Sequence, residues 1–333
     1  MPTHLIQLRR GNNRRVAIVE EPGLRLIGGA VSIYELANLA VEKQLKLDDT
    51  ARQHATGEVL EYDAIYAGRS EWRILPAIDH PLEPARCLVS GTGLTHLGSA
   101  RGRQAMHATS SEPLTYSMKM FGWGVEGGRP RNGEIGTSPE WFYKSNGTSL
   151  RAHGEPLEIP PFALDGGEEA ELAGIYLISD AGIPYRIGMA TGNEFSDHRF
   201  EKTNYLYLAS SKLRSCAIGP ELVLDPDFSS VTARIAVERD ERTLWSRTFD
   251  SGEAHMCHSL QNIEHHHFKF PAHRRPGDVH VHFFGTDCLS YSDGICLQEG
   301  DVMQMAFDGF GRPLRNPLHI DRTPQELIRV RML

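Results

Sequence analysis

Apolar residues in this chain occur in short runs, and this feature restricts the possible folds more than any other. The longest uninterrupted runs, such as Ile175 to Ile178, are only a few residues long. From Cys87 onward they are separated by glycine, proline and asparagine, which mark turns. A membrane-spanning helix needs roughly 20 apolar residues in succession, so none is expected here. We predict a folded, strand-rich protein with few helices beyond residue 87.

The first 80 residues differ from the rest in their pattern of expected strands and helices. Two short strands are expected at 16–19 and 24–27, joined by the turn Glu20-Glu21-Pro22-Gly23. Prolines at positions 81 and 84 then suggest a boundary. The sequence therefore predicts a small α+β region at 1–80 and a larger unit at 81–333.

Two helices are expected inside the N-terminal region. Ser32 and Glu35 have the spacing of a capping box. They precede apolar residues at helical spacing, namely Ile33, Leu36, Leu39 and Ala40. A second, polar helix is expected between Asp48 and Ile65.

The larger unit contains one clear alternating segment. Apolar residues at every second position between 231 and 237 alternate with more polar ones, and a charged turn leads into Leu244 and Trp245. This pattern predicts a β-hairpin with one face toward solvent. The fold class expected for the whole chain is α+β and β-rich.

Composition excludes several classes of partner. The chain has 333 residues and a net charge of -8, with no basic cluster larger than the pairs Arg14-Arg15 and Arg274-Arg275. A nucleic-acid-binding surface is therefore not expected. The first 15 residues lack the apolar stretch of a secretory signal, which favours the cytoplasm. The five cysteines are widely spaced with no CxxC pair, so we expect reduced thiols and no zinc site.

Two glutamates stand two positions apart at the start of an apolar run. If Glu169 and Glu171 lie on a strand, they point to the same face, with about 6–7 Å between their Cα atoms. Two like charges beside a core need a cation, and oxygen ligands favour Mg²⁺, with Mn²⁺ or Ca²⁺ as alternatives. A solvated acidic turn is the alternative interpretation.

A third carboxylate and an isolated lysine follow. Glu194 lies in Gly192-Asn193-Glu194-Phe195-Ser196, and Lys212 lies among small residues ahead of Gly219-Pro220. This combination is typical of a site that holds an anion near a metal. Taken alone, Lys212 could equally be a solvated surface lysine.

The order of these motifs resembles that of the fumarylacetoacetate hydrolase superfamily over roughly residues 87 to 320. The motifs are Trp141-Phe142-Tyr143-Lys144 with Thr148-Ser149-Leu150, Glu169-x-Glu171-Leu172, Asn193-Glu194-x-Ser196, Lys212 before Gly219-Pro220, Gly285-Thr286, Leu297-x-x-Gly300-Asp301, and Gly309-x-Gly311 ending at Asn316-Pro317. The resemblance implies a mixed β-roll core for residues 81–333. It also implies a homodimer or a higher homo-oligomer.

The same resemblance assigns roles to the acidic and substrate-binding residues. Glu169, Glu171 and Glu194 would be ligands of Mg²⁺, or of Mn²⁺, with Glu194 at a position where the family usually has aspartate. Lys212 would be a catalytic residue that also steadies substrate oxygens. Thr286 and Gly285 would bind the substrate, with Thr286 holding its carboxylate.

The resemblance also implies a catalytic histidine after the strand that opens the core. His96 has the expected spacing, although Gly93-Leu94 replaces the family's Asn-Tyr, and Ser99 stands where many members have glutamate. His107 is a competing candidate. A histidine group at 265–267, together with His280 and His282, could form a second metal site, but structural roles are the favoured interpretation.

Among the family's reactions, the variants around Glu194 and His96 are most similar to the sugar-acid branch. This implies a Mg²⁺-dependent dehydratase that converts a 2-keto-3-deoxypentonate to 2-oxoglutarate semialdehyde in non-phosphorylative pentose catabolism, through an enolate of the chelated 2-oxo acid. A C–C hydrolase of a diketo acid and a non-catalytic sugar-acid-binding protein remain as alternatives. In each case the partner is a small-molecule 2-oxo acid.

Overall fold

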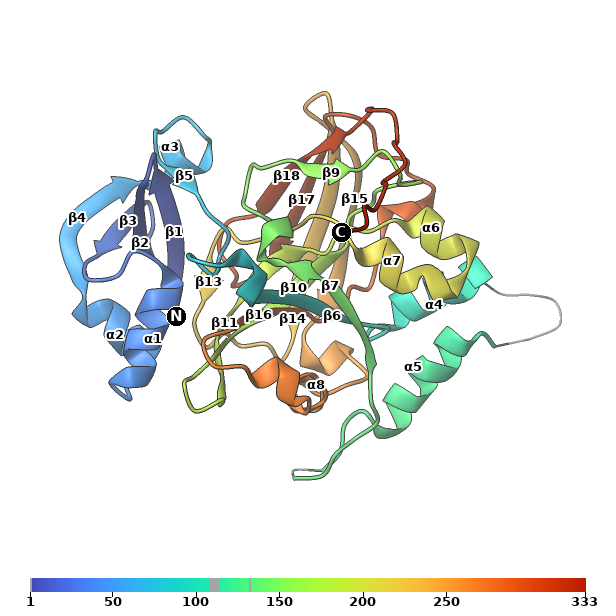
Figure 1. Ribbon diagram of the computed structural model, residues 1–333, viewed down its shortest axis with the longest axis horizontal. Helices are drawn as coiled ribbons and strands as arrows, with labels where there is room; N and C mark the ends of the chain where they lie inside the picture. The colour runs from blue at the N-terminus through green and yellow to red at the C-terminus, as the bar shows by residue number, and fades with distance from the viewer. Residues whose placement is uncertain (1, 108–113, 132) are drawn as a thin grey trace.

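The computed structural model describes residues 2–107, 114–131 and 133–333. Its N-terminal strands β1 (His4–Arg10), β2 (Asn13–Glu20), β3 (Gly23–Ile27) and β4 (Ala55–Glu61) pair in antiparallel order at one end of the molecule (Figure 1). The two strands expected from the sequence are confirmed within β2 and β3. Within the described residues, no helix combines the length and apolar character needed to cross a membrane.

The helix predicted after Ser32 is α1 (Ile33–Glu42), and the Ser32 side chain accepts a hydrogen bond from Glu35 N as a cap. The single helix predicted from Asp48 to Ile65 is wrong. This stretch forms α2 (Leu47–Gln53), then β4, then α3 (Tyr62–Tyr66). β4 pairs with β3 along its length, so strand pairing overrides the weak helical pattern of this segment.

The main sheet includes strands from both the N-terminal region and the larger unit. Beyond the N-terminal strands it contains β13 (Leu222–Val223), β11 (Pro184–Asn193), β10 (Ala170–Ile178), β16 (Val279–Phe283) and β6 (Cys87–Gly93), and it ends at β7 (Glu140–Asn146). β1 pairs with β13, so the N-terminal strands continue the sheet of the larger unit. β16 lies between β10 and β6, and pairs with β6 in parallel with Val279 opposite Cys87.

A second sheet contains the predicted hairpin. Its strands are β14 (Val231–Arg239), β15 (Arg242–Ser251), β17 (Val302–Phe307), β18 (Leu314–Ile320) and β9 (Leu157–Ile159). The apolar residues of β14 alternate with more exposed ones, as the sequence indicated. They pack into a core with Leu172, Met189 and Phe284, which connects the second sheet to the main sheet.

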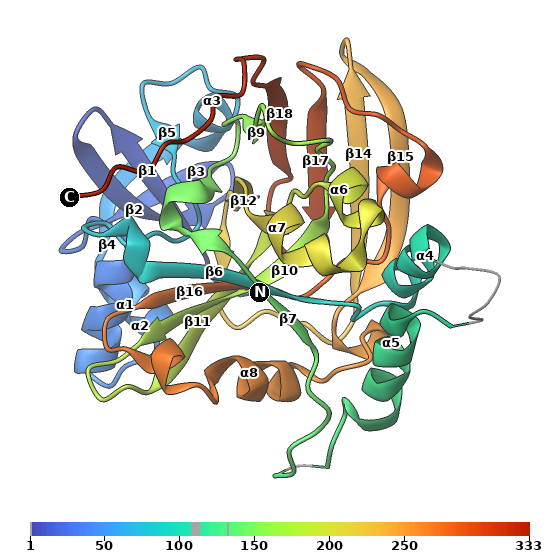
Figure 2. The same cartoon turned by 45° about the vertical axis from the view of Figure 1, so that its right-hand side comes forward.

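Short helices flank the sheets. They are α4 (Leu97–His107), α5 (Tyr116–Gly127), α6 (His198–Thr203), α7 (Leu208–Lys212) and α8 (Leu260–Phe268). α4 and α5 pack against each other at one flank, and α6 and α7 lie near them (Figures 1 and 2). The remaining short strands are β5 (Arg73–Ile74), β8 (Leu150–Arg151) and β12 (Cys216–Ile218).

Candidate metal centre

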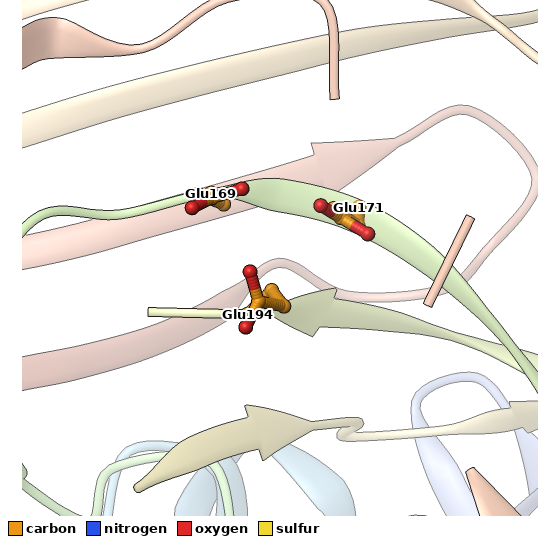
Figure 3. A group of neighbouring side chains, drawn as sticks. All are labelled: Glu169, Glu171 and Glu194. Carbon is orange, nitrogen blue, oxygen red and sulfur yellow. The ribbon is translucent and has the colours of Figure 1, made fainter. Parts of the chain in front are cut away.

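Two neighbouring strands bring the three predicted carboxylates together. Glu169 directly precedes β10, Glu171 is its second residue, and Glu194 directly follows β11. Because β10 and β11 are antiparallel, with Ala170 opposite Asn193, the start of one strand meets the end of the other. Figure 3 shows Glu169 and Glu171 along one segment of the chain and Glu194 at the end of the neighbouring strand.

The three side chains are buried, with relative exposures of 7% for Glu169, 3% for Glu171 and 0% for Glu194. One carboxylate oxygen from each lies within 4.8 Å of the others. In the part of the chain that the structure describes, no other group of three His, Cys, Asp or Glu side chains has this geometry. A donor set made only of oxygen suits a hard divalent cation such as Mg²⁺ or Mn²⁺.

Two buried lysines lie among these carboxylates. Lys212 Nζ is 2.5 Å from Glu169 Oε1 and 2.5 Å from Glu194 Oε2. Lys144 Nζ is 2.8 Å from Glu194 Oε1. The sequence did not assign a role to Lys144, although its alternation with Phe142 on β7 places both on the buried face and could have revealed it.

Electrostatics indicate an excess of negative charge. Burial and the charges of Glu169 and Glu194 raise the pKa of Glu171 well above its ordinary value. Burial also opposes ionisation of Glu169, but Lys212 and His198 outweigh burial and hold the pKa of Glu169 well below its usual range. Burial lowers the pKa of Lys212, and the attraction of Glu169 and Glu194 more than reverses this. A divalent cation would relieve the repulsion that Glu171 experiences.

Two of the carboxylates each have one oxygen held by the protein. Glu169 Oε1 accepts from Lys212 and from His198, and Glu171 Oε2 accepts from Gly285 N at 2.7 Å. Within the described residues, no hydrogen bond reaches Glu169 Oε2 or Glu171 Oε1. Glu194 differs, because a lysine lies at each of its oxygens. Glu169 and Glu171 are therefore better prepared than Glu194 to bind a cation directly.

A cavity of about 380 Å³ opens beside Glu169. Thr286, predicted as a substrate-binding residue, lines it, and so does His198. Its wall also includes Arg103, which donates to Glu140 at 2.7 Å and pairs with Glu201 at 2.8 Å. The other lining residues are Gly98, Ser99, Arg101, Gly102, Met106, Arg247, Asp287, Cys288, Leu289, Ser292 and Asp293. The cavity thus has a polar wall in which arginines and carboxylates are mixed and in which Thr286 supplies a hydroxyl.

The two candidate catalytic histidines are not brought to this cavity. His96 is fully buried, and its two ring nitrogens contact the hydroxyls of Thr95 and Ser251 at 2.8 and 3.2 Å. Burial, with a minor contribution from His255, lowers the pKa of His96 to about 3. His107 is the last residue of α4, and neither histidine lines the cavity. His198 does line the cavity. The sequence predicted no role for it, because the motif around it assigns a role only to Glu194.

The remaining histidine group lies between α8 and the main sheet. His267 Nε2 is 2.9 Å from His280 Nδ1, and Trp141 donates to His267 Nδ1. His282 contacts Ser90 and Thr92 through its two nitrogens. These hydrogen bonds join buried polar side chains between α8 and the sheet, which supports structural roles for this group.

A larger cavity of about 560 Å³ lies between α1, α2 and β11, and none of the predicted site residues lines it.

Sequence comparison gives one distant relative. No family model matches this chain. A curated protein of Haloferax volcanii named "Probable 2-keto-3-deoxyxylonate dehydratase" is 27% identical over 131 residues, which is 38% of this chain. The match spans 43% of that relative, less than half of its length.

Structure comparison covers nearly the whole chain. A 2-keto-3-deoxy-D-arabinonate dehydratase in its apo form superposes with a TM-score of 0.71 and 16% identity, over 96% of this chain and 100% of its own. The same protein complexed with magnesium and 2,5-dioxopentanoate gives the same values. A 2-hydroxyhepta-2,4-diene-1,7-dioate isomerase from Mycobacterium marinum superposes with a TM-score of 0.58 and 16% identity, over 96% and 98% of the two chains. The predicted fold is therefore confirmed.

Proposed function

We propose that this chain, which has the fold of the fumarylacetoacetate hydrolase superfamily, is a Mg²⁺-dependent dehydratase of a 2-keto-3-deoxy sugar acid. The observation that carries the proposal is the buried Glu169, Glu171 and Glu194 group beside a cavity lined by Thr286. The names of the structural neighbour and of the distant relative, and the magnesium and 2,5-dioxopentanoate in one neighbour, support it.

The reaction removes one water from a 2-keto-3-deoxypentonate. A proton leaves C3 and the hydroxyl leaves C4, and rearrangement of the unsaturated product then gives an aldehyde at C5. The product is 2,5-dioxopentanoate, also called 2-oxoglutarate semialdehyde. A divalent cation bound to the carboxylate and the 2-oxo group makes the C3 proton more acidic.

The chain's own residues bind and orient the substrate. Thr286 Oγ1, whose long 3.3 Å contact to the Cys288 carbonyl is easily exchanged, can donate to the substrate carboxylate. Lys212 Nζ donates to Glu169, Glu194 and Ser196, so it would donate to the 2-oxo oxygen by exchanging its 3.0 Å bond to Ser196. The roles of His96 and His107 as acid or base stay predictions.

A homo-oligomer is part of the proposal, and α5 supports it. Tyr116, Trp123 and Val125 on this helix are each more than half exposed, and Gly124 is its one buried residue. Exposed aromatic and aliphatic side chains of this kind are typical of surfaces that another chain covers.

The proposal has three further parts. Mn²⁺ can replace Mg²⁺, the protein is located in the cytoplasm, and its reaction belongs to pentose catabolism.

Turnover with a defined substrate tests the function directly. We expect the purified protein with Mg²⁺ to form 2,5-dioxopentanoate from 2-keto-3-deoxypentonate. EDTA should stop the reaction, and added Mg²⁺ or Mn²⁺ should restore it. Cleavage of a diketo acid without dehydration would support the C–C hydrolase instead. Binding of the sugar acid without turnover would support the non-catalytic alternative.

A further inference from the structure

His198 is the first residue of α6 and lies against the metal-binding carboxylates. Its side chain is 2% exposed, and its Nε2 is 3.1 Å from Glu169 Oε1. The backbone here is fixed by the neighbouring Asp197, whose carboxylate accepts from Leu164 N, Phe200 N and Arg214 Nη2. The imidazole therefore approaches Glu169 from a rigid part of the chain.

The opposite side of the ring lies on Gly167, where no side chain could fit. A Cβ at Gly167 would be 2.4 Å from His198 Nδ1 and 2.6 Å from its Cε1. Gly167 cannot withdraw easily, because it exchanges two backbone hydrogen bonds of 2.9 Å with Ser196. Its φ is not in the left-handed region, so the close approach of the ring, and not backbone conformation, requires glycine here.

The ring has one defined hydrogen bond. Nδ1 is buried and has no partner among the described residues, so the orientation of the ring depends on Glu169. Since a carboxylate oxygen only accepts, Nε2 must carry the hydrogen and donate it. Oε1 of Glu169 thus receives hydrogen bonds from both His198 and Lys212, while Oε2 receives none from the described residues.

We propose that His198 is a positioning residue that fixes the Glu169 carboxylate so that Oε2 faces a divalent cation, and that Gly167 is glycine so that the imidazole can reach it. Partners that orient metal ligands in this way typically contribute 10–100-fold to metal affinity. The inference rests on the metal site of the proposed function and is independent of the substrate.

Titration of the metal-free protein with Mg²⁺, followed by calorimetry, tests the inference without any substrate. His198→Leu removes the donor, and Gly167→Ala displaces the ring, so we expect each to weaken Mg²⁺ binding by about 10–100-fold. His198→Gln keeps an N–H at a similar reach and should bind Mg²⁺ nearly as wild type does. Circular dichroism and the melting temperature establish that each variant is folded.

Two matched variants serve as controls. Gly57→Ala adds a methyl group that would meet nothing within 4 Å, and His319→Leu changes a half-exposed histidine on β18. Both should keep wild-type Mg²⁺ affinity. If His198→Leu does not fold, Gly167→Ala and His198→Gln still decide the question.

Wild-type Mg²⁺ affinity in His198→Leu or in Gly167→Ala, or a loss of about 10–100-fold in folded His198→Gln, would overturn the inference. With substrate present, kcat should recover in His198→Gln together with Mg²⁺ affinity. If His198→Gln instead bound Mg²⁺ as wild type does but had a low kcat, His198 would be a catalytic residue, which would contradict the positioning role. A wild-type protein that binds Mg²⁺ but does not dehydrate the sugar acid would refute the proposed function alone.

Discussion

Replacing Glu171 by glutamine should stabilise the metal-free protein and abolish its stabilisation by Mg²⁺. The Glu171 carboxylate is buried, with Glu169 and Glu194 oxygens within 4.8 Å. Two unit charges at that separation repel by about 3.5 kcal/mol at an effective dielectric constant of 20. Because Lys212 offsets part of this repulsion, we expect a net gain of roughly 1–3 kcal/mol for the metal-free variant.

Mg²⁺ should stabilise the wild-type protein but not the Glu171→Gln variant. A ligand at 100 times its Kd stabilises the wild-type protein by about 2.7 kcal/mol. In Glu171→Gln the amide oxygen can still accept from Gly285 N. The NH₂ group then faces the cation, and because it only donates hydrogen bonds it repels the cation. We therefore expect no Mg²⁺-dependent stabilisation in this variant.

Thermal unfolding at pH 7, with and without Mg²⁺, measures both effects in one assay. Glu168→Gln is the matched control. Glu168 is equally buried on the same segment, but its carboxylate is bound by Ser290 and does not belong to the metal group. It should keep the wild-type Mg²⁺ shift. A Glu171→Gln variant with a wild-type Mg²⁺ shift, or a metal-free form less stable than wild type, would refute the reasoning.

Three further predictions follow from buried polar groups. Lys144→Met should destabilise the protein by about 1–3 kcal/mol in urea unfolding, because Glu194 Oε1 loses its buried partner while Lys212 still holds Oε2, and the double variant with Glu194→Gln should recover most of this loss. His96→Ala should lower the melting temperature, since both ring nitrogens of His96 contact buried hydroxyls, and, if His96 is the base, it should also slow solvent deuterium exchange at the substrate C3 by 10²-fold or more. Exchange within about tenfold of wild type would refute His96 as the base. Burial lowers the pKa of His280 and of His282 to about 3, so the unfolded chain binds more protons below pH 6.5. Stability should therefore fall by up to about 1.4 kcal/mol per pH unit for each histidine as the pH drops from 6.5 to 5, and a urea midpoint constant over that range would contradict this.

The sequence predicted those features of the site that depend on local spacing. The two-residue separation of Glu169 and Glu171 predicts that they share a face, and the structure brings them together, with Glu171 on β10 and Glu169 directly before it. The order of motifs assigned Glu194 to the same site, and the pairing of β10 with β11 brings it there.

Features that depend on contacts through space were not predictable in this way. Lys144 pairs with Glu194 across 50 positions, and nothing in the residues around Lys144 indicates that partner. His198 contacts Glu169 only because Gly167 leaves room for its ring. The spacing that selected His96 could not show toward which side of the chain its ring would turn. The helix expected at 48–65 was wrong because pairing with β3 decides the conformation there.

The parallel pairing of β6 with β16 has a consequence for the kinetics of folding. Ser90 and His282, which bond across this pair, are 192 residues apart in the chain. Closing so long a loop and pairing strands in parallel are both slow steps. During synthesis, β10 would emerge well before its neighbour β16, with one edge open to other chains. A chain truncated before Val279 would contain all three carboxylates of the candidate metal site, yet it would lack the strand that covers this edge and should aggregate.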